Sequence, residues 1–452
     1  MRSIRQFATL SAAGTLDPVE AVQECLSRIS DFDSQIHAFV WVDAEGSLSA
    51  AHVRRDELAA GYWRGPLHGV PIAVKELVDV AGGPNEYGST IRSGRVAAHD
   101  ASVVARLRRA GAIIVGTTRS HEFGWGITTQ HAERGSTRNP LALDRIPGGS
   151  SGGAGAAVAA GMVPACIATD TGGSIRIPSA FCGVAGLKTT FGVVDSAGVV
   201  PLAPSFDSVG VIAAHVSDLP LVFDQISDVS QVPEPTTLAP LTNLAGLRVG
   251  VAPLLVGAHP ANDRSRRYED AIQLAASLGA RIVELRTPAA ERFQRAFTVV
   301  QGCEAVDVHS NQLGYFPERS SEYLPGVRER LERASSFGLA DYLSARADCQ
   351  RLTVDLVSAM SQVDVLLTPV SLVAPPLVAS PDLVTVGDEQ IELRAAVMGF
   401  TVPQNVAGLP SVAFSAGLAP DGLPVGLQLS AVAGGERTCV AVADLLSREF
   451  CV

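Results

Sequence analysis

Short apolar segments alternate with segments of helical periodicity along this chain, and this alternation most limits how it can fold. Residues 69–75 (GVPIAVK) and 112–116 (AIIVG) are almost wholly apolar, as expected of strands buried on both faces. Residues 101–110 (ASVVARLRRA) have helical spacing and stop at Gly111. Buried strands separated by helices predict an α/β fold with covered sheet faces.

The first helix is expected to begin just after Asp17. Asp17 would be the N-cap, Pro18 would occupy the first helical position, and Glu20 would complete a capping-box-like pair. Farther along, the Pro-rich stretch within 230–245 (QVPEPTTLAP) predicts a surface linker.

The second half of the chain predicts further α/β structure. Residues 247–251, 263–278 and 281–285 predict a strand, a helix and a strand, a β-α-β unit. Residues 288–360 are mainly helical and richer in charge. A strand is expected at 363–367, followed by an apolar, Pro-studded loop at 369–381.

Composition and charge exclude several classes of protein. The net charge is -11 and no basic run is present, so a nucleic-acid surface is not expected. The seven cysteines are odd in number and form no CxxC pair, which indicates buried thiols in a reducing compartment. The first residues are too weakly apolar for a secretory signal. The small-residue stretch 152–173 is interrupted by polar residues, so it does not predict a membrane span. We therefore expect a cytoplasmic protein without a membrane span.

Lysine is rare among the basic residues. Of 35 Lys and Arg residues, only Lys75 and Lys188 are lysine. A buried lysine can lose its proton, whereas an arginine inside a protein cannot. The count nominates Lys75, at the end of an apolar strand, as a base, and Lys188 is expected to be structural.

Metal and phosphate sites have little support in the sequence. There is no HExxH motif, the nine histidines are dispersed, and no Cys/His cluster occurs. The glycines at 148–155 could cradle an anion at a helix N-terminus, but no Gly-Lys-Ser/Thr follows them. We expect neither a metal nor a cofactor.

One candidate nucleophile lies in the segment 148–152 (GGSSG), which fits the G-x-S-x-G pattern of α/β-hydrolases. That fold requires a strand directly before the serine, and then Asp and His later in the chain. The preceding residues NPLALDRIP make a poor strand, and the last histidine is His309. The segment therefore fits the α/β-hydrolase pattern poorly.

A second candidate nucleophile, Ser174, fits better. It follows Gly172 and Gly173, and such a turn lets backbone N–H groups converge on a developing oxyanion. Because no histidine stands out as a base, a neutral Lys75 could serve, with Ser150 of the Gly-rich loop passing the proton.

The segment 147–192 (PGGSSGGAGAAVAAGMVPACIATDTGGSIRIPSAFCGVAGLKTTFG) resembles the signature of the amidase-signature family. The strand ending at Lys75 and the segments NVAGLP and GLPVGLQ also match, so the resemblance covers essentially the whole chain. It implies a triad of Lys75, Ser150 in a cis peptide, and the nucleophile Ser174. It also implies an oxyanion hole from the N–H groups of Thr171, Gly172, Gly173 and Ser174, with support from Ser151, Asp170 and Arg176. Between Ser150 and Ser151, the motif register favours Ser150 as the relay.

The resemblance implies a fold as well: a mixed β-sheet core sandwiched between α-helices, with residues 1–452 as a single amidase domain. We expect the less typical region, about 288–400, to line the substrate pocket. No cofactor is implied, and because many relatives are dimers a homodimer is possible.

The expected function is cleavage of the C–N bond of small or aryl amides through an acyl-enzyme. A urethanase using the same triad on carbamates is one alternative, and the amidase subunit of a tRNA-dependent amidotransferase is another. That subunit typically has Gln where this chain has Ile177, which we expect to contact substrate in a more apolar site. A non-catalytic binding subunit is disfavoured because the triad is intact.

Overall fold

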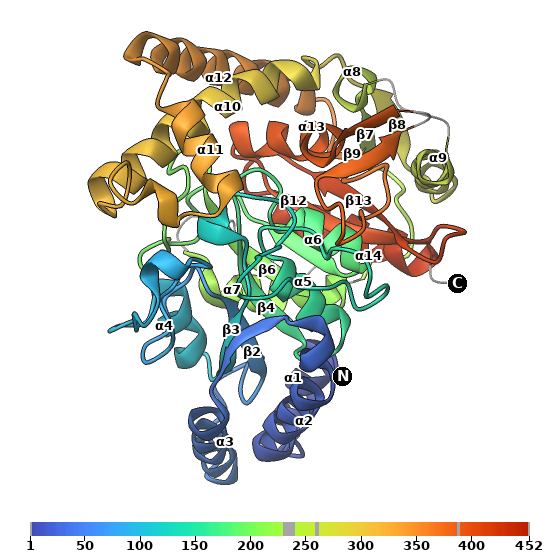
Figure 1. The fold of residues 1–452 in the computed structure, drawn as a ribbon. Coiled ribbons are helices and arrows are strands. Elements are labelled where there is room, and N and C mark those ends of the chain that lie inside the picture. Colours follow the sequence, from blue (N-terminus) through green and yellow to red (C-terminus); the bar gives the residue numbers. More distant parts are fainter. Residues whose placement is uncertain (1, 229–239, 258–261, 387–388, 451–452) are drawn as a thin grey trace.

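The computed structural model describes residues 2–228, 240–257, 262–386 and 389–450, and one mixed β-sheet forms its centre (Figure 1). Within these residues the sheet has 11 strands in the order β1-β3-β2-β4-β6-β5-β12-β13-β9-β7-β8, beside a separate β10-β11 hairpin. The strands are β1 (Phe39–Val42), β2 (Pro71–Lys75), β3 (Ile113–Thr118), β4 (Ala165–Asp170), β5 (Ala185–Lys188), β6 (Ser208–Ala213), β7 (Arg248–Val251), β8 (Arg281–Glu284), β9 (Val365–Pro369), β10 (Leu383–Val386), β11 (Glu389–Glu392), β12 (Ser411–Leu418) and β13 (Pro424–Ser430).

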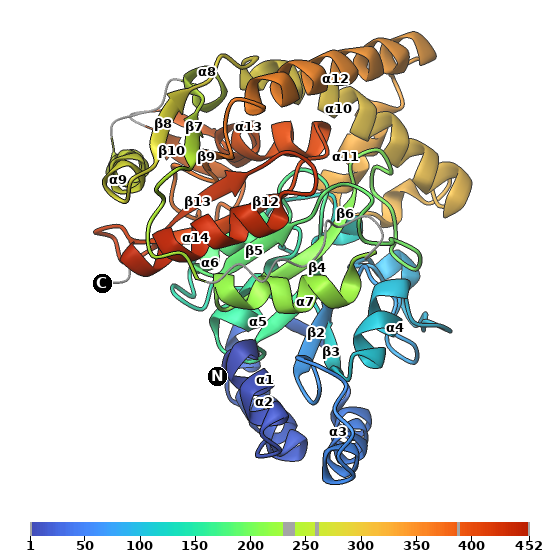
Figure 2. The same ribbon diagram turned by 180° about the vertical axis from the view of Figure 1, so that it is seen from behind.

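Helices cover both faces of this sheet, as Figure 1 and the reverse view in Figure 2 show. The α-helices are α1 (Ile4–Ala12), α2 (Pro18–Ile36), α3 (Ala44–Ala59), α4 (Ser102–Arg109), α5 (Gly152–Ala159), α6 (Arg176–Cys182), α7 (Leu219–Ile226), α8 (Pro253–Val256), α9 (Asp263–Ser277), α10 (Ala290–Asp307), α11 (Pro325–Ala334), α12 (Leu339–Met360), α13 (Leu393–Val406) and α14 (Glu436–Phe450). The predicted mixed sheet between helices is confirmed.

Successive strand residues enter opposite cores, as a pleated sheet requires. Ala73 of β2 and Cys166 of β4 pack in one cluster with residues of α2 and α5. Their neighbours Val74 and Ile167 pack in another, with residues of α4, α7 and α14. Because both faces are buried, these strands read as continuous apolar runs rather than as an alternating pattern.

The direction of the central strands brings the ends of two of them together. β2 is parallel to β4, with Val74 paired to Ile167, so both strands run toward the same edge of the sheet. β2 ends at Lys75 and β4 ends at Asp170. The lysine and the turn that follows Asp170 therefore lie close together. They are far apart in the sequence, since 94 residues separate Lys75 from Thr169 near the end of β4.

Several local predictions agree with these elements. Asp17 caps α2 by accepting a hydrogen bond from the Val19 N–H. The predicted β-α-β unit is β7, α9 and β8, with the two strands parallel. Of the predicted linker at 230–245, residues 230–239 lie outside the described residues. In the part of the chain that the structure describes, no helix is long and apolar enough to cross a membrane.

Candidate active site

Lys75 lies at the centre of the site, fully buried at the end of β2. Its Nζ donates to Ser150 Oγ and to Thr169 Oγ1, each at 2.8 Å. Burial lowers the pKa of Lys75 to about 7, against the charges of Asp170, Asp207 and Glu76, which raise it. At pH 7 a large share of this amine is therefore neutral and able to accept a proton.

Ser150 reaches the lysine from a loop rather than from a strand. The peptide bond between Gly149 and Ser150 is cis, and α5 begins two residues after Ser150, at Gly152. No strand occupies 140–149, all of which the structure describes, so the α/β-hydrolase elbow considered for this segment is absent. Ser151 lies beside it, with its hydroxyl donating to the Thr169 carbonyl at 3.3 Å.

Ser174 lies in the turn between β4 and α6 and is 7% exposed. Its carbonyl accepts a hydrogen bond of 3.3 Å from the Ser151 N–H, which ties this turn to the Ser150 loop. The structure thus brings Lys75, Ser150 and Ser174 together from β2, the glycine-rich loop and the β4–α6 turn.

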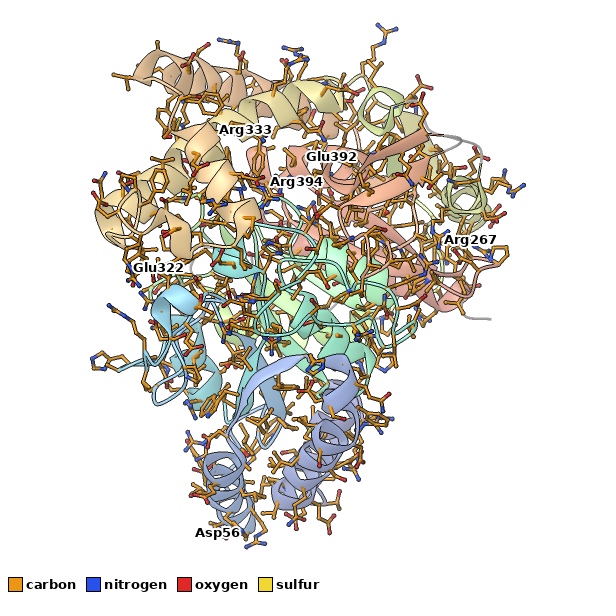
Figure 3. The ribbon with its side chains drawn as sticks, viewed as in Figure 1. Asp56, Arg267, Glu322, Arg333, Glu392 and Arg394 are labelled. Atoms are coloured by element: carbon orange, nitrogen blue, oxygen red, sulfur yellow. The ribbon has the colours of Figure 1, made fainter. Side chains whose placement is uncertain are left out.

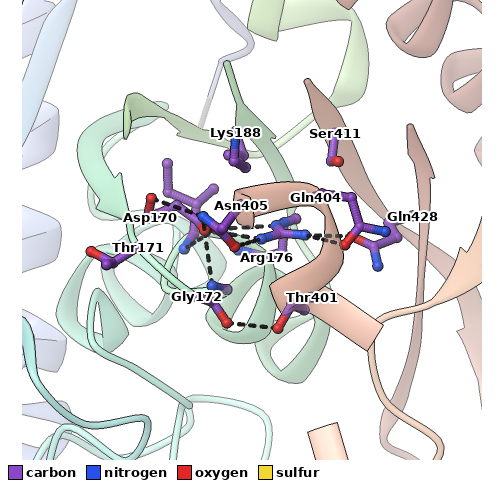
Figure 4. Close-up of polar contacts among 12 residues, drawn as sticks. Asp170, Thr171, Gly172, Arg176, Lys188, Thr401, Gln404, Asn405, Ser411 and Gln428 are labelled. Carbon is purple, nitrogen blue, oxygen red and sulfur yellow. Dashed lines mark hydrogen bonds and ion pairs between the residues drawn. The ribbon is translucent and has the colours of Figure 1, made fainter. Parts of the chain in front are cut away.

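Asp170 and Arg176 hold the shape of this turn (Figure 4). The Asp170 carboxylate accepts from the N–H groups of Gly173 at 2.8 Å and Ile175 at 3.0 Å, and pairs with the Arg176 guanidinium at 3.0 Å. Although burial opposes ionisation, the Arg176 charge and its hydrogen bonds keep the pKa of the Asp170 carboxyl well below its usual range. Because the Gly173 N–H is already bonded to Asp170, it is not free to bind an oxyanion, unlike our expectation from the sequence.

Three further residues fix the turn from outside it: Asp207, Thr401 and Asn405. The sequence did not single them out. The Thr171 hydroxyl donates to Asp207 at 2.6 Å, and the Thr401 hydroxyl donates to the Gly172 carbonyl at 2.7 Å. Asn405 donates to the Asp170 carboxylate at 2.8 Å. Asn405 does lie in the NVAGLP segment, but only the fold reveals which group it contacts.

Ile177 lies in α6 and is fully buried in an apolar cluster. A Cβ atom placed at Gly173 would lie 2.9 Å from the Ile177 Cδ1, so this side chain packs directly behind the Gly-Gly turn. From the region 288–400, Phe297 of α10 and Met398 of α13 also approach the turn, at 2.9 and 3.1 Å from a Cβ atom placed at Gly172.

The other lysine, Lys188, is buried too, but it differs from Lys75 in its partners. Its Nζ donates to the carbonyls of Thr189 at 2.8 Å and Leu409 at 2.9 Å. These bonds join β5 to the segment before β12. Across the described ranges, no group of three or more His, Cys, Asp or Glu residues could hold a metal ion.

A family model described as Amidase matches residues 20–440 of this chain. The chain belongs to the amidase-signature family. Members act on carbon–nitrogen bonds, and this amidase is accordingly an enzyme of that kind.

Similar proteins span nearly the whole length of this amidase. A glutamyl-tRNA(Gln) amidotransferase subunit from Chloroflexus aggregans is 34% identical, covering 97% of this chain and 94% of the relative. A crystal structure described as an amidase is 30% identical, covers 99% of this chain and 100% of its own, and has a TM-score of 0.89. The peptide amidase of Stenotrophomonas maltophilia is 28% identical, covers 100% and 97%, and has a TM-score of 0.84.

The ion pair between Asp170 and Arg176 gives a prediction about stability. Arg176→Met leaves the Asp170 carboxylate buried without its cation, so we expect the amidase to lose about 3–5 kcal/mol of unfolding free energy. Chemical denaturation followed by circular dichroism measures this loss. Arg351→Met removes an arginine from an exposed ion pair with Asp348 and should change stability little. Equal effects of the two substitutions would contradict the assigned role of the buried pair.

Proposed function

We propose that this amidase is a serine hydrolase in which Ser174 attacks the carbonyl carbon, Ser150 relays the proton and Lys75 is the base. The observation that carries the proposal is the 2.8 Å contact between the Lys75 amine and the Ser150 hydroxyl. A lysine with a pKa of about 7 fits a general base at neutral pH, because its neutral form is well populated there.

The proposed reaction has two steps. Ser174 Oγ bonds to the carbonyl carbon while its proton passes through Ser150 to Lys75, and the C–N bond then breaks as the nitrogen takes that proton. Water next attacks the acyl-enzyme, which releases a carboxylic acid and restores the serine. The backbone N–H groups of Thr171, Gly172 and Ser174 would stabilise the oxyanion in both steps.

The surroundings of the turn suggest how substrate is held. Ile177, Phe297 and Met398 are apolar and lie against Gly172 or Gly173. We therefore propose that the region 288–400 lines the acyl pocket within a single domain spanning residues 1–452.

The triad gives a direct prediction. Ser174→Ala and Lys75→Ala should each lower kcat by at least about 10³-fold, because each removes a group on which the others depend. Assays would use a primary amide, an anilide, an aryl ester and an aryl carbamate, the last of which tests for a urethanase. A fluorophosphonate probe, with the labelled peptide found by mass spectrometry, should modify Ser174 and not Ser150. Activity retained in Ser174→Ala, or label found on Ser150, would overturn the assignment.

The pKa of Lys75 gives a second prediction. The amine loses its charge as pH rises through about 7, so kcat/KM should rise with pH across this range and level off above it. The measurement is a pH–rate profile from about pH 5.5 to 9, corrected for stability at each pH. A flat profile over this range would argue against Lys75 as the base.

A second candidate is the amidase subunit of a tRNA-dependent amidotransferase. The curated relatives favour this setting over a free-standing hydrolase, since those at 34–35% identity are named as subunits of glutamyl-tRNA(Gln) amidotransferase. The position of Ile177, where that subunit typically has Gln, favours the free-standing enzyme. The chemistry at Ser174 is the same in both settings.

Purification of the tagged protein from its native cell separates the two settings. An amidotransferase subunit should elute with stoichiometric partner chains and show little amide hydrolysis without them. A free-standing amidase should elute alone, as a monomer or homodimer by light scattering, and be fully active. A stable complex with partner chains would exclude the free-standing setting.

A further inference from the structure

A cavity of about 140 Å³ lies at the edge of the sheet where β2 and β4 end. Residues between 191 and 209, which connect β5 to the start of β6, form most of its wall, and Leu77 and Gly124 add to it. Among the residues that the structure describes, none from the region 288–400 lines this cavity. It therefore differs from the side on which α10 and α13 approach the β4–α6 turn.

The inner end of the cavity contains groups that contact the proposed triad. Thr169 lines it, and its Oγ1 accepts the hydrogen bond of 2.8 Å from Lys75 Nζ. Gly124 lines it too, and a Cβ atom placed at this glycine would lie 3.7 Å from Ser150 Oγ. Because Gly124 has no side chain, no group from this residue separates Ser150 from the cavity. The cavity thus adjoins both the base and the relay.

The walls of the cavity are mainly apolar. Leu77 and Leu202 line it and belong to a cluster of buried apolar and aromatic side chains. The polar side chains of Thr171 and Asp207 also line it, but they are bonded to each other at 2.6 Å. Phe191 is part of the lining and is 44% exposed, so the cavity approaches the protein surface at this residue. A group that fills this space would therefore contact mostly hydrocarbon.

The proposed reaction decides which half of a substrate this cavity faces. When the C–N bond breaks, its electron pair stays on the nitrogen, and the nitrogen takes the proton that Ser150 relays. The leaving nitrogen must then lie within hydrogen-bond reach of Ser150, while the carbonyl carbon is held at Ser174. A substituent on that nitrogen would extend into the cavity beside Ser150 and Lys75. Cavities of about 150 Å³ hold one benzene ring, which sets the size of group that fits here.

We propose that this cavity binds the substituent of the leaving amine, and that this amidase prefers N-substituted amides whose amine carries one apolar group no larger than a six-membered ring. The inference rests on the hydrolytic function proposed above and adds the class of amine that is released. Water and such an amide yield a carboxylic acid and a primary amine, whereas a primary amide yields ammonia. The preference arises because the apolar group leaves water and packs against Leu77 and Leu202.

The first test varies only the amine. Butyramide, N-methylbutyramide, N-benzylbutyramide and N-(1-naphthylmethyl)butyramide share one acyl group, and released butyrate is the readout for all four. The kcat/KM of the N-benzyl amide should exceed that of the N-methyl amide by roughly 10- to 100-fold, because burial of one aromatic ring contributes on this scale. The naphthylmethyl amide should fall below the benzyl amide, since its second ring exceeds the cavity. Equal kcat/KM for the N-methyl and N-benzyl amides would overturn the inference.

Two substitutions change the cavity in opposite directions. Leu202→Phe fills part of it and should lower the ratio of N-benzyl to N-methyl kcat/KM by about 10-fold or more, with folding checked by circular dichroism. Phe191→Ala widens the end near the surface and should raise the kcat/KM of the naphthylmethyl amide relative to the benzyl amide. If Leu202→Phe does not fold, Phe191→Ala decides alone. Wild-type ratios in the folded variants would contradict the assignment of this cavity.

Phe32→Ala is the matched control for Phe191→Ala and should leave all of these ratios unchanged. Phe32 is 40% exposed on α2. This helix packs on the opposite face of the sheet from Val209, which lines the cavity. Figure 3 shows Asp56 of α3, the helix beside α2, at the bottom of the molecule.

The second test needs no catalysis. Binding of the N-benzyl and N-methyl amides to the Ser174→Ala protein is measured by calorimetry, with and without Leu202→Phe. The N-benzyl amide should bind about 10-fold or more tightly than the N-methyl amide, and Leu202→Phe should remove this difference. Such binding without turnover of any amide by the wild type would support the inference and refute the hydrolytic function. Turnover of butyramide without any preference for the N-benzyl amide would overturn the inference alone.

Discussion

The buried ion pair between Asp170 and Arg176 is the interaction on which the rest of the site depends. Asp170 fixes two backbone N–H groups of the β4–α6 turn, and Arg176 extends the network to Gln404, Asn405 and Gln428. The turn is thereby tied to α13 and β13, which come from the last quarter of the chain. Neither charge could stay buried alone, because removal from water costs several kcal/mol per ion. Each is tolerated only while the other is in place, so the pair holds the Gly-Gly-Ser turn in one conformation.

Lys75 and Arg176 are both fully buried, but burial has opposite consequences for their charges. Arg176 faces a carboxylate at 3.0 Å and remains a cation, as arginine must. Lys75 lies nearby, but its hydrogen bonds at 2.8 Å go to two hydroxyls rather than to a carboxylate. Burial therefore lowers its pKa to about 7 and frees a lone pair at neutral pH. Arg176 keeps its charge and holds the turn, whereas Lys75 is partly neutral near pH 7 and can accept a proton there.

The site draws on two separate parts of the fold. The proposed triad lies on β2, the glycine-rich loop and the β4–α6 turn, whereas Phe297 of α10 and Met398 of α13 approach the turn from the region 288–400. Substitutions on those two helices can alter the pocket without moving the triad.

The sequence by itself determined the local elements and nominated the reacting groups. Apolar runs predicted β2 and β3, and Asp17 and Pro18 predicted the start of α2. The scarcity of lysine in the chain nominated Lys75, and the glycine-rich motif nominated Ser150 and Ser174. These signals are local, since strand burial, helix capping and tight turns depend on neighbouring residues. Only the tertiary structure decided which further groups contact these residues and the turn: Thr169, Asp207 and Thr401. Thr401 contacts a carbonyl 229 residues away, and no local periodicity encodes such a contact. In the folded chain the Gly173 N–H donates to the Asp170 carboxylate. The motif did not predict this bond, because hydrogen-bond partners depend on how the chain packs.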